Sequence, residues 1–368
     1  MHTFQPTQFP RPIARAIDLG SGFVKFTTDC PDQNTINCDL FPSVAVECDG
    51  GVDVDGDGAS IKRDLIRVVV NGKAYSVGKD VKSKRTKGRV RGTDYSETDE
   101  YLALTYGAFA YMLKKMGVHE ARIDVLVVGL PISTLAKYKD TLAKKMVGEH
   151  IINDEMRVVV GECIVRSQPR GGYDFIRATT GQEDEQLKRD MDSGAVLVVD
   201  PGYYTLDWLY AEEGKGDAQF SGAINDGGMS MILDRVAAEL ARDFGADEQA
   251  FLFEKDKIDH FLQTGEPFFY DGRYQDDVER YRNIARAQAG EYIQLMLERI
   301  KEKKGFIRKV IEVGGSNHIY GKLLKDVFGE NRVFTSKDSV FTNVKGYQVA
   351  GNVRVKSLAN AIQGLRVA

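Results

Sequence analysis

The order of hydrophobic and polar positions changes its period along the chain. Short runs rich in β-branched and aromatic residues, which are typical of strands, occupy residues 13–18, 22–27 and 42–48. Residues 66–78 contain two more such runs around Asn71-Gly72, the residue pair that most strongly indicates a tight hairpin. This part of the chain is therefore predicted to consist of strands joined by turns.

From residue 99 the period is that of a helix. Residues 99–117 place Leu102, Phe109, Met112 and Leu113 on one face before Gly117 ends the pattern. Further on, the patterns predict a buried strand at 122–131, a helix at 135–149 and a strand at 157–165.

The second half repeats this order. The patterns predict a hairpin at 195–210, a helix at 229–244, a mainly helical and highly charged region at 247–304, and a strand, glycine turn and helix at 309–329. Mixed strands that are each followed by helices indicate an α/β fold. The similar order of elements in both halves indicates an internal duplication.

Composition narrows the class of protein. The chain has 368 residues, enough for two domains, and 42% of them are hydrophobic, as in globular proteins. It contains no apolar run of 18 residues, no apolar stretch near Met1 typical of a secretion signal, and no C-x-x-C pair among its four cysteines. We therefore expect a cytoplasmic protein without a membrane partner, and the net charge of −4 neither indicates nor excludes a nucleic-acid partner.

An aspartate followed by a glycine-rich turn lies between the first two predicted strands. The segment runs from Asp18 through Gly20, Ser21 and Gly22 to Lys25. Glycines expose backbone N–H groups that bind phosphate oxygens, and a lysine adds a positive charge. An aspartate at the strand end suits Mg²⁺ held through water. The alternative is an ordinary hairpin with an aspartate in its turn.

The same arrangement recurs at Asp200. Gly202 gives a second place where a ligand can approach the backbone, and Thr205 offers a hydroxyl or an N–H donor. Asp200 supplies a carboxylate for the far side of the metal. Two such turns closing on one Mg²⁺-triphosphate predict a clamp between two domains.

Two Gly-Gly pairs flank predicted helices. Gly314-Gly315, followed by Ser316, ends a strand before a helix and allows backbone to lie flat against a base or ribose. Gly227-Gly228 precedes another helix, whose N-terminus suits a ribose or phosphate. Ordinary packing and helix entry are the alternatives. Neither the G-x-x-x-x-G-K-[ST] loop nor G-x-G-x-x-G after a strand is present.

These segments, in this order, resemble the phosphate-1, phosphate-2 and adenosine motifs of the actin-fold ATPases. The motifs are Asp-x-Gly-x-Gly-x-x-Lys, Asp-Pro-Gly-x-x-Thr-x-Asp and Val-Gly-Gly. Residues 69–80, 127–133 and 341–352 are most similar to ParM/StbA-type plasmid-segregation actins, including the actin-like protein D of PRTRC gene clusters.

The resemblance implies two duplicated α/β domains around a nucleotide cleft. Domain I would comprise residues 1–191 and the returning segment 344–368, and domain II residues 192–343 with a helical subdomain at about 246–305.

The resemblance also implies the site residues. Asp18 and Asp200 would flank Mg²⁺ through water, and Gln168 would orient the attacking water. Residues 182–192 are expected to lengthen the segment after Gln168 as a loop. The nucleotide, ATP or GTP, would be held by Gly20, Ser21, Gly22, Phe23, Lys25, Gly202, Tyr203, Thr205, Gly227, Gly228, Gly314, Gly315 and Ser316.

The implied function is ATP–Mg²⁺-dependent polymerisation into filaments, with ATP hydrolysis, for plasmid DNA segregation. The implied partners are further copies of the chain and a DNA-binding adaptor protein, without direct binding to nucleic acid. Alternatives are a small-molecule kinase of the same superfamily, with Asp207 as its base, and a non-hydrolysing scaffold gated by nucleotide.

Two charged segments have simpler explanations. The segment from Asp53 to Asp64 resembles a calcium loop but lacks the usual glutamate at position twelve and flanking helices, so an acidic hairpin loop is favoured. The basic run from Lys79 to Arg91 is interpreted as a solvated loop, with a filament, adaptor or DNA contact as the alternative.

Overall fold

A computed structural model describes residues 12–30, 35–48, 63–81, 92–180 and 184–367, the last of these without side chains beyond residue 361. The segment from Asp53 to residue 62, most of the basic run between Lys79 and Arg91, and residues 182–183 therefore lie outside the described residues. Within those that are described, no helix combines the length and apolarity needed to cross a membrane.

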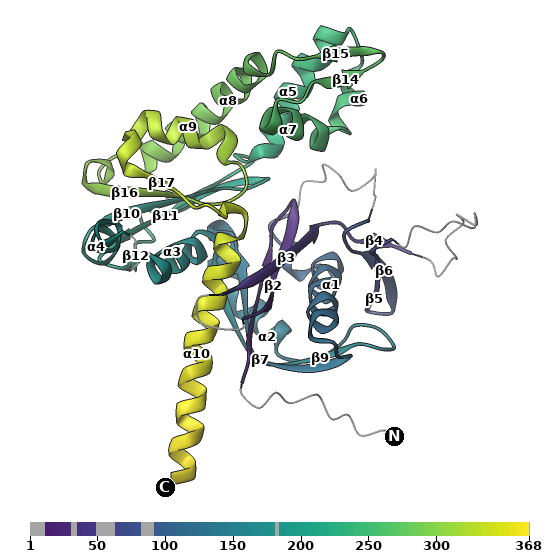
Figure 1. The fold of residues 1–368 in the computed structure, drawn as a ribbon, viewed down its shortest axis with the longest axis vertical. Coiled ribbons are helices and arrows are strands. Elements are labelled where there is room, and N and C mark those ends of the chain that lie inside the picture. The colour runs from purple at the N-terminus through teal and green to yellow at the C-terminus, as the bar shows by residue number, and fades with distance from the viewer. Residues whose placement is uncertain (1–11, 31–34, 49–62, 82–91, 181–183, 368) are drawn as a thin grey trace.

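The first half of the chain is built on a mixed six-stranded sheet (Figure 1). Its strands, in spatial order, are β3 (Asn37–Pro42), β2 (Phe23–Asp29), β1 (Ala14–Leu19), β7 (Glu120–Leu130), β9 (Arg157–Ser167) and β8 (Gly148–Ile151). A separate three-stranded sheet holds β4 (Val46–Glu47), β6 (Lys73–Val77) and β5 (Ile66–Val70). Asn71 and Gly72 have positive φ angles of 50° and 79°, so the predicted hairpin turn is confirmed.

The second half repeats the plan. Its main sheet follows the order β12 (Lys215–Gly216), β11 (Thr205–Glu212), β10 (Ala195–Pro201), β16 (Ile307–Glu312) and β17 (Val333–Thr335), with β13 (Gly222–Asn225) beside β11. In each half an antiparallel hairpin is extended by two parallel strands. The registers match as well, because Asp18 pairs with Lys25 in the first hairpin and Asp200 with Asp207 in the second. The two halves therefore correspond in strand order and in the register of their hairpins.

Ten α-helices lie among the described residues. They are α1 (Asp99–Met116), α2 (Ile132–Met146), α3 (Gln168–Thr179), α4 (Glu185–Ser193), α5 (Met229–Phe244), α6 (Glu248–Leu252), α7 (Lys255–Thr264), α8 (Val278–Arg299), α9 (Asn317–Phe328) and α10 (Thr342–Val367). α1 begins where the Thr98 hydroxyl accepts a hydrogen bond from the Tyr101 N–H, and it ends at Gly117 with φ 68°.

The alternation of side chains in β1 and β10 directs both aspartates to the middle of the molecule. Ala14 and Ala16 pack against α10, whereas Ile17 belongs to the core on the opposite face. Asp18 lies two residues after Ala16 in the strand, so its side chain is on the same face of the sheet, which α10 covers. In the same way Asp200 follows Val196 and Val198, which pack with residues of α3 and α4. Figure 1 shows α3 and the start of α10 between the two sheets.

The structure corrects three details of the expected elements. Of residues 42–48, Pro42 ends β3, and only Val46 and Glu47 form a strand of their own, β4. The expected loop at 182–192 is wrong, because helix α4 forms there and buries Leu187 and Met191 on one face. The charged region 247–304 is mainly helical, as predicted, but it includes a hairpin of β14 (Phe268–Tyr270) and β15 (Arg273–Gln275).

Candidate nucleotide site

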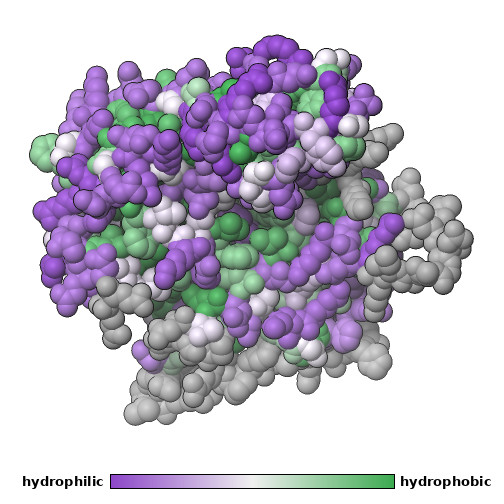
Figure 2. All heavy atoms as spheres, turned by 45° about the horizontal axis from the view of Figure 1, so that its top comes forward, coloured by the Kyte–Doolittle hydropathy of each residue, from purple (hydrophilic) through white to green (hydrophobic). Residues whose placement is uncertain are grey.

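A cleft of about 910 Å³ lies between the two halves, and residues from both line it. In Figure 2 it corresponds to a hollow in which apolar residues gather. Among the predicted site residues, those that line this cleft are Asp18, Gly20, Ser21, Gly22, Phe23, Lys25, Gln168, Asp200, Gly202, Tyr203, Thr205, Gly314, Gly315 and Ser316. The structure therefore brings together segments that are far apart in the sequence.

The first acidic turn is held by groups from three elements. Asp18 is 1% exposed, and its carboxylate lies 3.4 Å from Lys25 Nζ, which comes from the paired position on β2. Gln168, the first residue of α3, donates from Nε2 to the other carboxylate oxygen of Asp18 at 3.1 Å. The Ser43 hydroxyl donates to the Gly20 carbonyl at 2.6 Å and fixes the turn.

The second acidic turn is joined to the third predicted segment. Asp200 is 7% exposed and accepts a hydrogen bond of 2.6 Å from the side-chain amide of Asn343, at the start of α10. Gly314 has φ 84°, and a Cβ there would lie 2.5 Å from an Asp200 carboxylate oxygen. Only glycine fits this close approach without strain. Gly314 therefore borders Asp200 directly.

The two turns face each other across the cleft. A Cβ built on Gly22 would lie 3.8 Å from the Cβ of Tyr203, which follows Gly202 in the second turn. A ligand seated between them would be within reach of backbone from both domains. This is the geometry expected for a clamp on a phosphate chain.

A third buried carboxylate, that of Asp207, joins the two halves through hydrogen bonds. Asp207 is 1% exposed and accepts hydrogen bonds from the Thr205 hydroxyl at 2.5 Å and from the Ile132 backbone N–H at 2.9 Å. Ile132 begins α2 in the first half, and the residue at the N-cap of that helix, Pro131, makes no side-chain cap hydrogen bond. Asp207 thus supplies the missing cap from the opposite half.

Burial makes the charge of these carboxylates costly. The pKa of Asp200 is raised to about 7, first by burial and then by the nearby charges of Asp207 and Asp18, while Lys25 and the Asn343 amide oppose the rise. Burial also raises the pKa of Asp207 to about 6. Three buried carboxylates beside Lys25 favour a cation in the cleft. The described residues contain no group of three or more His, Cys, Asp or Glu side chains placed to ligate a metal directly.

The raised pKa values predict how the stability of the empty protein depends on pH. The folded state binds protons more tightly than the unfolded chain at Asp200 and Asp207, so this stabilisation is complete below about pH 4. It is lost as the pH rises through 6 and 7. Without nucleotide and Mg²⁺, we expect the free energy of unfolding to fall by a few kcal/mol between pH 5 and pH 8, since one pKa unit corresponds to about 1.4 kcal/mol. Urea titrations at pH 5 and pH 8 measure this difference in the free energy of unfolding.

The control for this pH dependence is the double variant D200N/D207N, in which the fall should be largely absent. Unfolding free energy that stays constant or increases from pH 5 to pH 8 in the unsubstituted protein would contradict the arrangement.

Gly227 and Gly228 take a different place from the one predicted. They do not line the cleft. The N–H groups of Gly228, Met229 and Ser230 donate to the carbonyls of Tyr204, Gly202 and Tyr203. The N-terminus of α5 is therefore used to hold the second acidic turn, and its first N–H groups are not available to a ribose or phosphate.

Sequence reasoning missed several residues of the cleft. Asn343 lies in the segment 341–352 that carried a family resemblance, but nothing in the sequence connected it with Asp200. Residues Asp256, Asp259, His260 and Gln263 of α7 also line the cleft. Their helical spacing of three and four residues was the available signal.

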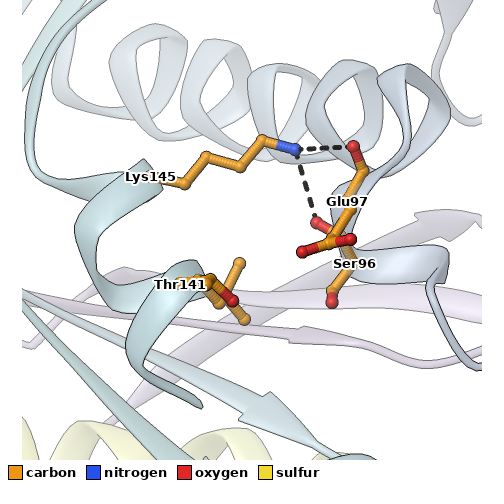
Figure 3. Close-up of a pocket in the computed structure, with 5 residues that line it drawn as sticks. Ser96, Glu97, Thr141 and Lys145 are labelled. Atoms are coloured by element: carbon orange, nitrogen blue, oxygen red, sulfur yellow. Dashed lines mark hydrogen bonds between the residues drawn. The ribbon is translucent and has the colours of Figure 1, made fainter. Parts of the chain in front are cut away.

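A smaller pocket of about 210 Å³ lies in the first half beside α2 (Figure 3). Its Lys145 Nζ donates to the backbone carbonyls of Ser96 and Glu97 at 3.4 and 3.2 Å. Burial lowers the pKa of this lysine. Because its ammonium group already binds the end of a helical turn, it fastens α2 to the segment before α1.

Comparison with known proteins agrees with this geometry. Residues 16–171 match the N-terminal domain of actin-like proteins, and residues 198–326 match the C-terminal domain of archaeal MreB-like actin homologues. The chain therefore belongs to the actin-like proteins. More particularly, its fold is that of the ParM-like actin homologues. No significant match is found among curated protein sequences.

Three solved structures illustrate the likeness. The archaeal actin homologue Ta0583 in complex with ADP has a TM-score of 0.69 at 17% identity, and the match covers 92% of this chain and 99% of that one. The actin-like protein Alp7A has a TM-score of 0.70 at 16% identity, covering 95% and 99%. A ParM from Clostridium botulinum in a 15-stranded filament has a TM-score of 0.68 at 18% identity, covering 93% and 99%.

Proposed function

We propose that this chain is a nucleotide hydrolase that polymerises with ATP and Mg²⁺ and serves plasmid DNA segregation. The observation that carries the proposal is the meeting of two equivalent acidic turns, at Asp18 and Asp200, in one cleft between duplicated domains. The ADP bound to Ta0583 and the filament of the Clostridium botulinum ParM support it.

The donors of the cleft fit a metal-bound triphosphate. Lys25 and the N–H groups around Ser21 and Gly202 suit phosphate oxygens, while Asp18 and Asp200 suit the water shell of Mg²⁺. Bound Mg²⁺ would neutralise charge on the phosphates during transfer. Closure of the two turns excludes bulk water and holds the phosphate chain in one orientation.

Gln168 is placed to orient a water. Its Nε2 donates to Asp18, which fixes the direction of the side chain, and its amide oxygen has no protein donor among the described residues. A neutral amide orients water and stabilises charge without removing a proton. Its position as the first residue of α3 places it at the junction of the halves.

Replacing Gln168 by alanine is expected to lower kcat by about 10²-fold with little change in nucleotide affinity. The side chain acts on the water and not on the ligand. Single-turnover hydrolysis measures the first quantity, and a fluorescent nucleotide measures the second. Gln294→Ala, which makes the same truncation on exposed α8, is the control and should behave like the unsubstituted protein. Unchanged kcat in Gln168→Ala would remove this residue from the proposed mechanism.

One set of measurements separates this function from its alternatives. Phosphate release without an acceptor, together with ATP–Mg²⁺-dependent light scattering and pelleting, supports the filament ATPase. Filaments without turnover would identify a scaffold, and turnover only with a small-molecule acceptor a kinase. The engagement of Asp207 by the Thr205 hydroxyl and the Ile132 N–H disfavours its use as a kinase base. Repeating the pelleting with GTP tests the base preference, and adding plasmid DNA with candidate adaptors tests the segregation role.

A further inference from the structure

The helices α3 and α10 occupy equivalent places in the two halves. β9 is the second parallel strand beside β1, and β17 is the second parallel strand beside β10. α3 begins directly after β9, and α10 begins after β17 and the short 3₁₀-helix Ser339–Phe341. Both helices lie between the two sheets (Figure 1). The duplication therefore extends from the strands to these two helices.

Each of these helices places a side-chain amide on one of the two acidic turns. Gln168, the first residue of α3, donates to Asp18 at 3.1 Å. Asn343, the second residue of α10, donates from Nδ2 to Asp200 at 2.6 Å. Among the described residues, no other group donates a hydrogen bond to the Asp200 carboxylate. Asn343 is thus the counterpart of Gln168 in the second half, both by its place in the fold and by its contact.

The two amides differ in burial. The side chain of Gln168 is half-buried, whereas Asn343 is 4% exposed. The amide oxygen of Asn343 is buried and has no donor among the described residues. A Cβ built on Gly172 of α3 would lie 3.1 Å from that oxygen, so the amide is packed closely against the helix. Asn343 is therefore fixed by packing, and it acts on Asp200 rather than on a ligand.

The start of α10 borders both oxygens of the Asp200 carboxylate. Asn343 binds Oδ2, and Oδ1 lies beside Gly314, where a Cβ would approach it to 2.5 Å. The Gly314 N–H donates to the Ser339 carbonyl at 3.1 Å, in the segment just before α10. One oxygen is thus held directly, and the glycine loop beside the other is held by the same segment. These contacts give the carboxylate one defined orientation.

The start of α10 is itself fixed against α3. A Cβ built on Gly171 would lie 2.5 Å from the Asn343 carbonyl oxygen and equally close to the ring of Tyr347, which is fully buried. Glycine permits this close approach of the two helices. Because α3 also carries Gln168, the two amides keep one relative position. Through them the two acidic turns are held in register with each other.

We propose that Asn343 is a positioning residue, the counterpart of Gln168, that holds the Asp200 carboxylate in the orientation in which it binds the water shell of Mg²⁺. This inference rests on the proposed function, because the metal is that of the bound nucleotide. Mg²⁺ keeps several of its waters, so the acceptors of its shell must stand at defined places. A hydrogen-bonded partner that orients such an acceptor typically contributes about 10–100-fold to metal affinity or activity.

The test compares nucleotide binding with and without Mg²⁺ in the full chain. Asn343→Leu keeps the branched shape of the side chain and removes its N–H donor. A fluorescent, non-hydrolysable ATP analogue is titrated in excess Mg²⁺ and in EDTA, at protein concentrations too low for pelleting. The ratio of the two dissociation constants is the gain from Mg²⁺. In Asn343→Leu this gain should fall at least about tenfold, whereas the affinity in EDTA should change less than about twofold.

A double-mutant cycle shows whether Asn343 acts through Asp200. Asp200→Asn alone should also lose most of the gain from Mg²⁺, because it removes the charge that attracts the metal shell. Adding Asn343→Leu to Asp200→Asn should lower the gain by less than about a further twofold, since the carboxylate that Asn343 orients is already absent. A structural role unconnected with Asp200 would give two losses that multiply.

Gln348→Met serves as the control for loss of a buried amide. Gln348 is fully buried on the same helix, but it accepts from the Thr27 hydroxyl and donates to the Ala14 carbonyl, outside the cleft. Methionine keeps the length of the side chain. This variant should unfold at a lower urea concentration and keep the full gain from Mg²⁺. Circular dichroism verifies that each variant folds, and Asn343→Ala replaces Asn343→Leu if leucine prevents folding.

A folded Asn343 variant that keeps the full gain from Mg²⁺ would overturn the assignment and leave the proposed function intact. Losses that multiply in the double variant would overturn it as well. Failure of the proposed function has a different signature. The unsubstituted chain would then bind the nucleotide no more tightly in Mg²⁺ than in EDTA, and it would release no phosphate from ATP.

Discussion

Replacing Asp200 by asparagine is expected to lower nucleotide turnover by at least about 10²-fold while the chain stays folded. The carboxylate is buried at the centre of the cleft, opposite the first acidic turn. Asparagine keeps its size but carries no charge to hold the shell of a metal ion. Phosphate release under saturating ATP and Mg²⁺ measures the loss.

The same substitution should stabilise the empty protein at pH 8. Burial and the charge of Asp207 oppose ionisation of Asp200, so removing that charge relieves a penalty. The gain should disappear at pH 4, where both aspartates bind a proton in the folded state. Opposite changes in turnover and in unfolding free energy distinguish a functional carboxylate from a merely structural one.

Asp190→Asn is the matched control. Asp190 is also buried, at 5% exposure, but it lies on α4 outside the cleft. Its variant should hydrolyse nucleotide like the unsubstituted chain. Normal turnover in Asp200→Asn would refute the assignment of the site.

Gly346→Ala is expected to lower the free energy of unfolding by about 3 kcal/mol or more, or to prevent soluble expression. Gly346 lies where α10 crosses α3, and a Cβ there would lie 1.7 Å from the Gly171 carbonyl oxygen. That oxygen belongs to backbone and cannot rotate away. The two helices must therefore separate, which also displaces Gln168 and Asn343 at their N-termini.

A second glycine, Gly290, provides the control for the Gly346→Ala variant. Gly290 lies inside α8, and nothing is within 4 Å of a Cβ built on it. Gly290→Ala should leave stability unchanged or raise it by up to about 1 kcal/mol, because alanine favours helix. Urea unfolding of both variants gives the comparison, and equal stabilities would contradict the close helix crossing.

The sequence predicted helices and strands well in segments where a single hydrophobic period, that of a helix or that of a strand, dominates. The helix of residues 99–117 and the hairpin at Asn71-Gly72 are confirmed because caps and turn residues agree with the hydrophobic period. The helix at 185–193 was missed because its polar face dominates the composition, and Leu187 and Met191 are its main apolar signal. The hairpin at Asp271-Gly272 carried the same kind of turn signal as the first one, but the surrounding helical charges hid it.

The candidate site was predictable where the residues of a motif are neighbours in the sequence and form one turn. Both acidic turns are local hairpins, so their residues meet in the cleft as expected. Contacts that depend on tertiary packing were not predictable in this way. The hydrogen bonds from Asn343 to Asp200 and from the Ile132 N–H to Asp207 join positions separated by 143 and 75 residues. Gly227 and Gly228 are the opposite case. Their sequence pattern predicted a ligand contact, but this segment binds the second acidic turn through backbone hydrogen bonds.

The register of the two hairpins implies that the halves are no longer interchangeable. The residue paired with the first aspartate is Lys25, and the residue paired with the second is Asp207. A chain assembled from two copies of the first half would bring two lysines to its centre, and one from two copies of the second half would bring four carboxylates. The difference at this paired position gives the two sides of the cleft unlike charges, so a ligand seated between them has one preferred direction.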